Sequence, residues 1–452
     1  MKFKVLKDSA LGECGVYLSG DNAFMLQPSS GATLLTSKSL MDQIFNHQNM
    51  SDVLPILSSR GFVLSGAEEE LISKHFAPRF FMIDLTRACN NRCLYCFRRL
   101  SQSEYIESDR LEKILVKLIE YCKKYKIPQI SIQAWGGEPL LAWGDICHIQ
   151  DCLIEAGIKV RILVETNGVA VTSSMASEMY KRGILCSVSI DGPAFIHNQN
   201  RLLINSKGSH YAAVRGLKLL REAGYNNHVG VVCVVTKSSL PHLKEIIHYF
   251  SSELCLNQVK MNVVKETKGM RDRTLGLTSL NIRQYWEMMI DEIIEMNRNG
   301  ISFGENTIIA MLHNLTTRRP VSFCHSRGCQ SGYRMLSFGM DGGLYPCDLT
   351  DIEELKLGDI ESSLDLLEIV GGQKNTHPFM TIQVPSVCRS CEWRFFCAGG
   401  CVSMRLLESK VSEPNSPDCI RNRIIYPKLI ELILNEPHLI SLMTNGVISI
   451  TS

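Results

Sequence analysis

Hydrophobic and polar positions follow a repeating pattern through the middle of the chain. Short apolar runs alternate with longer stretches in which apolar residues recur at helical spacing, and this alternation favours βα units and a parallel sheet. The expected strands are residues 80–87, 129–135, 159–165, 185–190, 229–235 and 258–264. The expected helices are 109–124, 143–156, 173–182, 211–223, 239–250 and 282–297. Six such units predict an α/β fold, a partial (β/α)6 barrel like three quarters of a TIM barrel, with active residues at the carboxyl ends of its strands.

The first 76 residues show a different pattern. Short strands are expected at 1–6, 14–18 and 23–26, and short helices at 37–47, 51–59 and 66–75. A cap that packs on the central part is one interpretation of such a unit. Near the other end, the apolar stretch 421–434 predicts a helix that packs on the core.

Length and charge limit the classes of function. A chain of 452 residues suggests several domains. Its net charge of +2 gives no bulk attraction to nucleic acid or to an anionic membrane. The N-terminus lacks the apolar segment of a signal peptide, and no stretch reaches about 18 uninterrupted apolar residues. We therefore expect a cytoplasmic protein that binds neither nucleic acid nor membrane.

The chain contains 18 cysteines, most of them clustered. In a reducing compartment, clustered cysteines are more often metal ligands than disulfide partners. The remaining seven are scattered in apolar runs and are expected in the core: Cys14, Cys122, Cys147, Cys152, Cys186, Cys233 and Cys255.

One cluster follows the first expected barrel strand. Cys89, Cys93 and Cys96 form a C-x3-C-x2-C pattern on one loop, and soft thiolates of this kind select iron–sulfur clusters or zinc. The loop has no fourth ligand. In a four-iron cluster, three cysteines leave one iron open to a substrate or cofactor, which points to chemistry. A structural zinc loop and reduced core cysteines are the alternatives.

A second block holds eight cysteines in the order C-x4-C-x17-C, then C-x2-C-x5-C-x3-C-x17-C. Eight thiols suit two fully ligated clusters, and bound metal would then contribute much of this region's folding energy. Two zinc sites, as in a zinc ribbon, are the alternative. The cysteines are Cys324, Cys329, Cys347, Cys388, Cys391, Cys397, Cys401 and Cys419.

The first cluster loop, with Tyr95 before its last cysteine, resembles that of the radical S-adenosylmethionine (SAM) enzymes. The resemblance implies that SAM chelates the open iron and that one electron cleaves it to a 5′-deoxyadenosyl radical, which abstracts a hydrogen atom from substrate. Trp135-Gly136-Gly137-Glu138 resembles the family motif that holds the methionyl amino group of SAM. The implied SAM contacts are Tyr95, Gly136, Gly137, Glu138, Asn167, Ser189 and Arg201. For Asn167 and Asp191, plain turn chemistry is an equal alternative. His197 follows the turn that contains Asp191, and the resemblance implies no role for it.

The eight-cysteine block resembles the SPASM extension of radical SAM enzymes, which implies two auxiliary [4Fe-4S] clusters and three clusters in all. Matched by position, one would take Cys324, Cys329, Cys347 and Cys401, and the other Cys388, Cys391, Cys397 and Cys419. In sulfatase-maturing relatives the aspartate at the position of Asp348 is proposed to deprotonate the substrate. Beside an anionic cluster its pKa would be raised, as a general base requires. A local turn or cap is the alternative role.

The resemblance divides the chain into a winged-helix-like leader-peptide recognition domain (1–76), a radical SAM barrel (77–310), a SPASM domain (311–425) and a C-terminal helix (426–452). The first hypothesis for function is a maturase that cross-links a ribosomally synthesised precursor peptide, by a carbon–carbon cyclophane or a thioether bond. Its partners would be the precursor with its leader and an electron donor such as flavodoxin or ferredoxin. The alternatives are an anaerobic sulfatase-maturing enzyme that makes formylglycine, and a non-catalytic metal scaffold.

Overall fold

The computed structural model describes residues 1–8, 11–63, 78–101, 103–266, 269–317, 321–350, 352–407 and 416–450. They belong to two compact units. The terminal unit combines Met1–Lys74, Thr278–Cys329 and Gln383–Ser452, and the central unit combines His75–Leu277 and Gln330–Ile382. These units divide the chain differently from the expected domains, because helix α9 (Ser279–Arg298), expected to be the last barrel helix, packs against the C-terminal helices.

The central unit is built on a mostly parallel sheet. All six expected strands are present, within one residue at each end, and each pairs in parallel with the next along the chain. They are β5 (Phe80–Thr86), β6 (Gln129–Gly136), β7 (Lys159–Thr166), β8 (Leu185–Ser189), β9 (Gly230–Val235) and β10 (Gln258–Val263). Beyond β5 the sheet continues with three unpredicted short strands: parallel β12 (Met335–Phe338), then antiparallel β13 (Gly343–Tyr345) and β14 (Gly358–Asp359).

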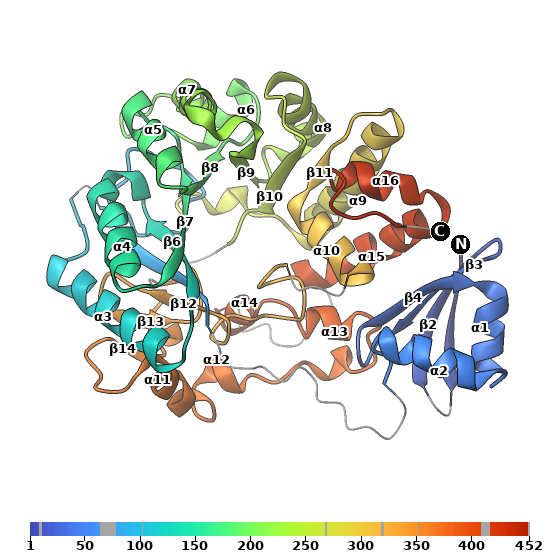
Figure 1. Cartoon of the computed structure of the whole chain (residues 1–452). Coiled ribbons are helices and arrows are strands. Elements are labelled where there is room, and N and C mark those ends of the chain that lie inside the picture. Colours follow the sequence, from blue (N-terminus) through green and yellow to red (C-terminus); the bar gives the residue numbers. More distant parts are fainter. Residues whose placement is uncertain are drawn as a thin grey trace. The chain divides into compact units, whose positions relative to one another are not determined.

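Helices lie outside the strands from β5 to β10 (Figure 1). The longest of them, α3 (Ser108–Lys124), buries Leu111, Ile114, Leu115 and Leu118 on one stripe and exposes charged residues opposite, which is the pattern of an amphipathic surface helix. The others are α4 (Trp143–Glu155), α5 (Ser173–Lys181), α6 (Ala194–Asn200), α7 (His210–Leu220) and α8 (Leu243–His248), and the central unit also contains α11 (Leu366–Gln373) and α12 (Pro378–Thr381). Helices α6, α11 and α12 have no counterpart among the predicted elements.

The N-terminal part of the terminal unit is an antiparallel meander with two helices. Strands β1 (Lys2–Asp8), β2 (Gly12–Ser19), β3 (Asn22–Gln27) and β4 (Ala32–Ser37) pair in that order. Helices α1 (Lys38–Phe45) and α2 (Met50–Ser59) follow, and their apolar residues share one core with those of the sheet. Strand β4 was not predicted, and the expected third helix lies outside the described residues. The structure therefore supports a small sheet-and-helix unit, without establishing a winged helix.

The remaining helices of the terminal unit come from the second half of the chain. They are α9, α10 (Asn306–Thr316), α13 (Arg394–Cys397), α14 (Val402–Leu407), α15 (Pro417–Asn435) and α16 (Pro437–Met443), with the short strand β11 (Gly304–Glu305). The expected C-terminal helix is α15, which packs on α9 and stacks Tyr426 on Trp393 with 4.7 Å between ring centroids. None of the described helices is long and apolar enough to span a membrane.

The scattered cysteines follow the prediction in part. Cys14, Cys122, Cys186 and Cys233 are buried as expected. Cys147 and Cys152 are only partly buried, because they lie toward the solvent side of α4, and Cys255 is exposed. The core prediction is wrong for these three residues.

Candidate functional site

The three-cysteine loop follows β5 at the carboxyl edge of the parallel strands. Cys93 is buried, and Cys89 and Cys96 are partly buried. The backbone N–H of Asn91 donates to Cys89 Sγ over 3.4 Å. Asn167 Nδ2, from the end of β7, lies 3.7 Å from the same sulfur and donates to Asn90 Oδ1 at 2.6 Å. Hydrogen bonds to cysteine sulfur are among the means by which a protein tunes an iron–sulfur cluster.

The donor set fits an iron–sulfur cluster better than a single ion. Within the described ranges, no three His, Cys, Asp or Glu side chains are arranged to hold one metal ion. A cubane does not require that arrangement, because each cysteine ligates a different iron. Burial, with the charge of Glu138, raises the pKa of the Cys89 thiol to about 12, and burial raises that of Cys93 to about 11. A bound cluster would supply the positive charge that these buried thiols need to lose their protons.

The predicted Gly-Gly-Glu motif touches this loop through its backbone. Gly137 N–H donates to Thr86 O at 2.7 Å, and Glu138 N–H donates to Ala88 O at 2.9 Å. A Cβ on Gly136 would lie 2.2 Å from Thr86 O, and one on Gly137 would lie 2.4 Å from Ala88 O. Gly136 also has a φ of +141°, which disfavours other residues. The two glycines are therefore needed for the close approach of β6 to the cluster loop.

The Glu138 carboxylate lies under the same loop and is only 1% exposed. It accepts hydrogen bonds from Thr166 Oγ1 at 2.6 Å, Asn167 N at 2.8 Å and Leu140 N at 3.1 Å. Through these contacts Glu138 fixes the end of β7, and with it the side chain of Asn167. Its predicted contact with the amino group of SAM stays a prediction.

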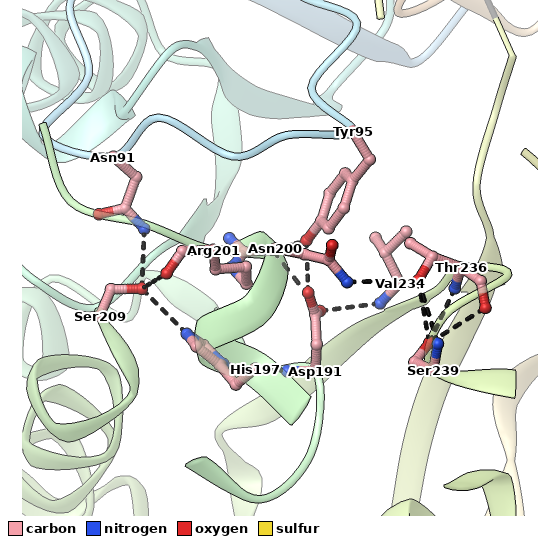
Figure 2. Close-up of polar contacts among 10 residues, drawn as sticks. All are labelled: Asn91, Tyr95, Asp191, His197, Asn200, Arg201, Ser209, Val234, Thr236 and Ser239. Carbon is pink, nitrogen blue, oxygen red and sulfur yellow. Dashed lines mark hydrogen bonds and ion pairs between the residues drawn. The ribbon is translucent and has the colours of Figure 1, made fainter. Parts of the chain in front are cut away.

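Tyr95, Asp191 and Arg201 form a buried polar group beside the loop (Figure 2). Tyr95 Oη donates to Asp191 Oδ2 at 2.6 Å and accepts from Arg201 at 2.5 Å. The other carboxylate oxygen of Asp191 accepts from Val234 N at 2.9 Å. Asp191 thus joins the cluster loop to β9, and its role near SAM stays a prediction.

Two predicted contacts for the carboxylate of SAM lie at this edge. Arg201 Nε is buried and has no hydrogen-bond partner among the described residues, so one guanidinium donor is available to an anionic ligand. Ser189 is the last residue of β8 and is partly buried. Both positions fit the expected ligand, and both assignments stay predictions.

Asp348, the predicted base, follows β13 and lies beside a lysine that sequence reasoning missed. Lys265 Nζ is 2.9 Å from Asp348 Oδ2. Burial acts to raise the pKa of this carboxyl, but the charge and hydrogen bond of Lys265 outweigh it, and the pKa lies below its ordinary value. The expected raised pKa is therefore not found. The reason is the lysine, which lies 83 residues away in sequence.

A buried ion pair links the cluster loop to the segment after Cys347. Arg98, two residues beyond Cys96, pairs with Asp84 of β5 and donates to Thr350 Oγ1 at 2.8 Å. Thr350 Oγ1 in turn donates to Asp84 Oδ2 at 3.0 Å. Sequence reasoning missed this triad, although an aspartate inside the apolar strand 80–85 is itself a signal that a buried partner exists.

The predicted auxiliary cysteines divide into two cases. In the terminal unit, the pKa of Cys388 is raised by burial and by the charge of Cys419, and that of Cys391 is raised by burial and by the charges of Cys419 and Cys388. Burial and the charge of Asp418 raise the pKa of the Cys397 thiol, and the charges of Cys391 and Cys388 raise it further. These four thiols, one complete predicted ligand set, therefore lie near one another. The other set draws Cys324, Cys329 and Cys401 from the terminal unit and Cys347 from the central unit, and it stays a prediction.

Comparison with known proteins agrees with this site. Residues 83–250 match the family model of the radical SAM superfamily. Over 331 residues, the chain is 24% identical to a cysteine-type anaerobic sulfatase-maturating enzyme of Clostridium perfringens, an alignment that covers 69% of this chain and 85% of that protein.

Two solved structures show the same fold. The first, "Native anSMEcpe with bound AdoMet", matches with a TM-score of 0.65 and 22% identity and covers 79% of this chain and 100% of that one. The second, Streptococcus suis SuiB bound to precursor peptide SuiA, matches with a TM-score of 0.55 and 15% identity and covers 94% of this chain and 100% of that one. Residues 83–250 therefore form a radical SAM domain, and the fold of the chain is that of these two structures.

Proposed function

We propose that this protein is a maturase that cross-links a ribosomally synthesised precursor peptide. The observation that carries the proposal is the meander β1–β4, which presents an exposed sheet edge. Strand β1 pairs only with β2 within the described residues, and most of its residues are exposed. Unpaired backbone donors and acceptors at such an edge can take a peptide as an additional strand. A leader segment of the precursor is the occupant that this function requires.

The extent of the structural likeness supports the same proposal. The match to the anSMEcpe structure covers 79% of this chain, whereas the match to the peptide-bound SuiB structure covers 94%. A fold that accounts for nearly the whole chain is thus found in a protein crystallised with its precursor peptide. The cross-link would be a carbon–carbon cyclophane or a thioether.

In this proposal Cys89, Cys93 and Cys96 would hold the iron–sulfur cluster that binds SAM, and SAM would supply a 5′-deoxyadenosyl radical for the removal of one hydrogen atom from the peptide. Closing the link then requires the loss of one proton and one electron. The proposed proton acceptor is the Asp348 carboxylate, which is ionised beside Lys265, although its lowered pKa makes it a weaker base than the sequence predicts. Two auxiliary [4Fe-4S] clusters would accept the electron and pass it on, and the neighbouring thiols of Cys388, Cys391, Cys397 and Cys419 would hold one of them. Flavodoxin or ferredoxin is the proposed donor for the first reduction.

A second candidate function is the maturation of a sulfatase by oxidation of Cys or Ser to formylglycine. It is favoured by the similarity to the Clostridium perfringens enzyme and by the placement of Asp348 directly after Cys347. This function does not need a leader-binding edge, so the role of β1 separates the two candidates.

Mass spectrometry tests the proposal. The short peptide encoded next to the gene is co-expressed with the protein without oxygen, and each link is expected to lower its mass by about two units, because two hydrogens are lost. Cys89→Ala is the control and should abolish the change. An unchanged precursor together with an aldehyde on a sulfatase-derived peptide would replace the proposal by the second candidate. Full iron loading without any SAM cleavage would support a scaffold.

Proline substitution tests the sheet edge. Along an edge strand, the N–H groups of successive residues point alternately to the neighbouring strand and to solvent, so one of Lys4 and Val5 directs its N–H outward. Proline at that position removes a donor without breaking the meander. This variant should keep its thermal stability and lose affinity for a fluorescent leader peptide. If neither Lys4→Pro nor Val5→Pro changes the affinity for the leader peptide, β1 is excluded as the leader-binding edge.

A further inference from the structure

A short segment braces the cluster loop from one side. Residues 200–209, here called the brace, run antiparallel to the loop and make backbone hydrogen bonds with it. Arg92 N donates to Leu202 O at 2.6 Å, and Leu94 N donates to Asn200 O at 2.9 Å. The conformation of the loop between its cysteines therefore depends on the conformation of the brace.

The hydroxyl group of Ser209 links the two ends of the brace. Ser209 donates to Arg201 O at 2.8 Å through Oγ and at 3.2 Å through its backbone N–H. The same Oγ lies 3.3 Å from Nδ2 of Asn91, which stands midway between Cys89 and Cys93. A hydroxyl has one hydrogen to donate and two lone pairs to accept with. Since its hydrogen goes to Arg201 O, Ser209 accepts from Asn91.

The second lone pair of Ser209 faces His197, and this contact fixes the state of the imidazole ring (Figure 2). Asp191 N–H donates to His197 Nδ1 at 3.2 Å, so Nδ1 carries no proton. His197 Nε2 lies 2.9 Å from Ser209 Oγ, whose hydrogen is already used, so Nε2 must carry the proton and donate it. His197 and Ser209 are completely buried, and Asn91 is 3% exposed. The ring is therefore held as the neutral Nε2–H tautomer inside a buried chain of hydrogen bonds.

We propose that His197 is a positioning residue for the iron–sulfur loop: its Nε2–H holds Ser209, and Ser209 holds Asn91 between two of the cluster cysteines. The ring also links two residues of the loop, Asn91 and Tyr95. Its Nε2 reaches Asn91 through Ser209, and its Nδ1 accepts from Asp191, whose carboxylate binds Tyr95. The inference rests on the radical SAM cluster loop and not on the identity of the substrate. A failure to find the proposed peptide therefore leaves it intact.

Two variants separate hydrogen bonding from simple packing. In His197→Gln the amide nitrogen can reach the place of Nε2 and donate to Ser209. In His197→Asn the shorter side chain can replace only Nδ1 and accept from Asp191. Both remove the ring, so a packing role predicts similar damage. The proposed role predicts that His197→Gln stays near wild type, whereas His197→Asn loses iron to a chelator about tenfold faster.

The spectroscopic readout identifies the cluster that is affected. Only the cluster with an open iron is expected to change its electron paramagnetic resonance spectrum when SAM binds. His197→Asn should weaken this SAM-dependent change and leave the remaining signal as in wild type. His210→Gln is the matched control, since the His210 ring lies beside His197 but hydrogen-bonds to Tyr249.

Ser209→Ala keeps the test decisive if His197→Asn does not fold. It removes the shared hydroxyl and should reproduce the iron loss and the spectral change, and adding His197→Asn to it should cause little further loss, because both act through one contact. Equal damage by Gln and Asn at position 197, or wild-type iron retention and spectra in Ser209→Ala, would overturn the proposal.

Discussion

Tyr95 Oη donates a hydrogen bond of 2.6 Å to the carboxylate of Asp191, which ties the residue before the last cluster cysteine to the loop after β8. Both side chains are buried, and Arg201 completes the group. Tyr95→Phe leaves two charged groups short of a partner, so we expect the free energy of unfolding to fall by about 1–3 kcal/mol. Urea unfolding measures this change. Tyr105→Phe is the control, because Tyr105 is 44% exposed and should change stability by less than about 0.5 kcal/mol.

The Gly-Gly contact with the cluster loop makes a second prediction. In Gly137→Ala the new Cβ would lie 2.4 Å from Ala88 O, a backbone atom that cannot move without moving the loop. We expect a loss of more than about 1 kcal/mol in stability and weaker iron binding, measured by unfolding and iron analysis. Gly144 in α4 has open space around its Cβ position. Gly144→Ala should therefore stabilise the protein by about 0.5–1 kcal/mol. Equal effects of the two substitutions would contradict this interpretation.

The buried ion pair between Arg98 and Asp84 should be far more important than an exposed one. Asp84→Asn leaves the Arg98 charge buried without its counter-charge, so we expect a loss of about 3–5 kcal/mol. Thr350→Val removes only the bridging hydroxyl and should cost about 1–2 kcal/mol. The control is Glu104→Gln, which breaks the exposed pair with Arg87 and should cost at most about 1 kcal/mol. Chemical denaturation of the three variants compares these losses.

How well the sequence predicted this molecule depends on the distance over which each signal acts. Strands β5–β10 were predicted almost to the residue, because each is marked by a local pattern: a continuous apolar run in β5 and β9, and apolar residues alternating with more polar ones in β6, β7, β8 and β10. Helix α6 and strands β12–β14 were missed, since seven residues or fewer carry too little periodicity to stand out, and the longer helices α10 and α11 were missed as well. The cluster cysteines were found from local spacing. The partners Lys265 and Thr350 were not, because they lie 83 and 266 residues away from Asp348 and Asp84.

The neutral His197 predicts a dependence of stability on pH. Burial, together with the positive charge of Arg201, lowers its pKa from 6.5 to about 2. Below about pH 6.5 the unfolded chain binds a proton that the folded ring does not. Lowering the pH therefore lowers the free energy of unfolding, by up to about 1.4 kcal/mol per pH unit from this residue. Above that pH both forms are neutral and the contribution vanishes. His197→Gln should reduce the slope by about half a proton at pH 6.5 and by nearly one proton at pH 5, and an unchanged slope would mean that the folded ring titrates normally.

Asp348 makes the prediction that bears most directly on the chemistry. If its carboxylate accepts the proton released when the link closes, Asp348→Asn should lower the yield of modified peptide about 10²-fold or more. SAM cleavage should continue, because the contacts around Cys89, Cys93 and Cys96 are unchanged. Anaerobic assays that quantify 5′-deoxyadenosine and modified peptide in the same sample separate the two steps. The control is Asp291→Asn, which alters an exposed aspartate of α9 that pairs with Lys428. Wild-type yield in Asp348→Asn would assign the proton to another acceptor and leave Asp348 with its ion pair to Lys265 as a structural contact.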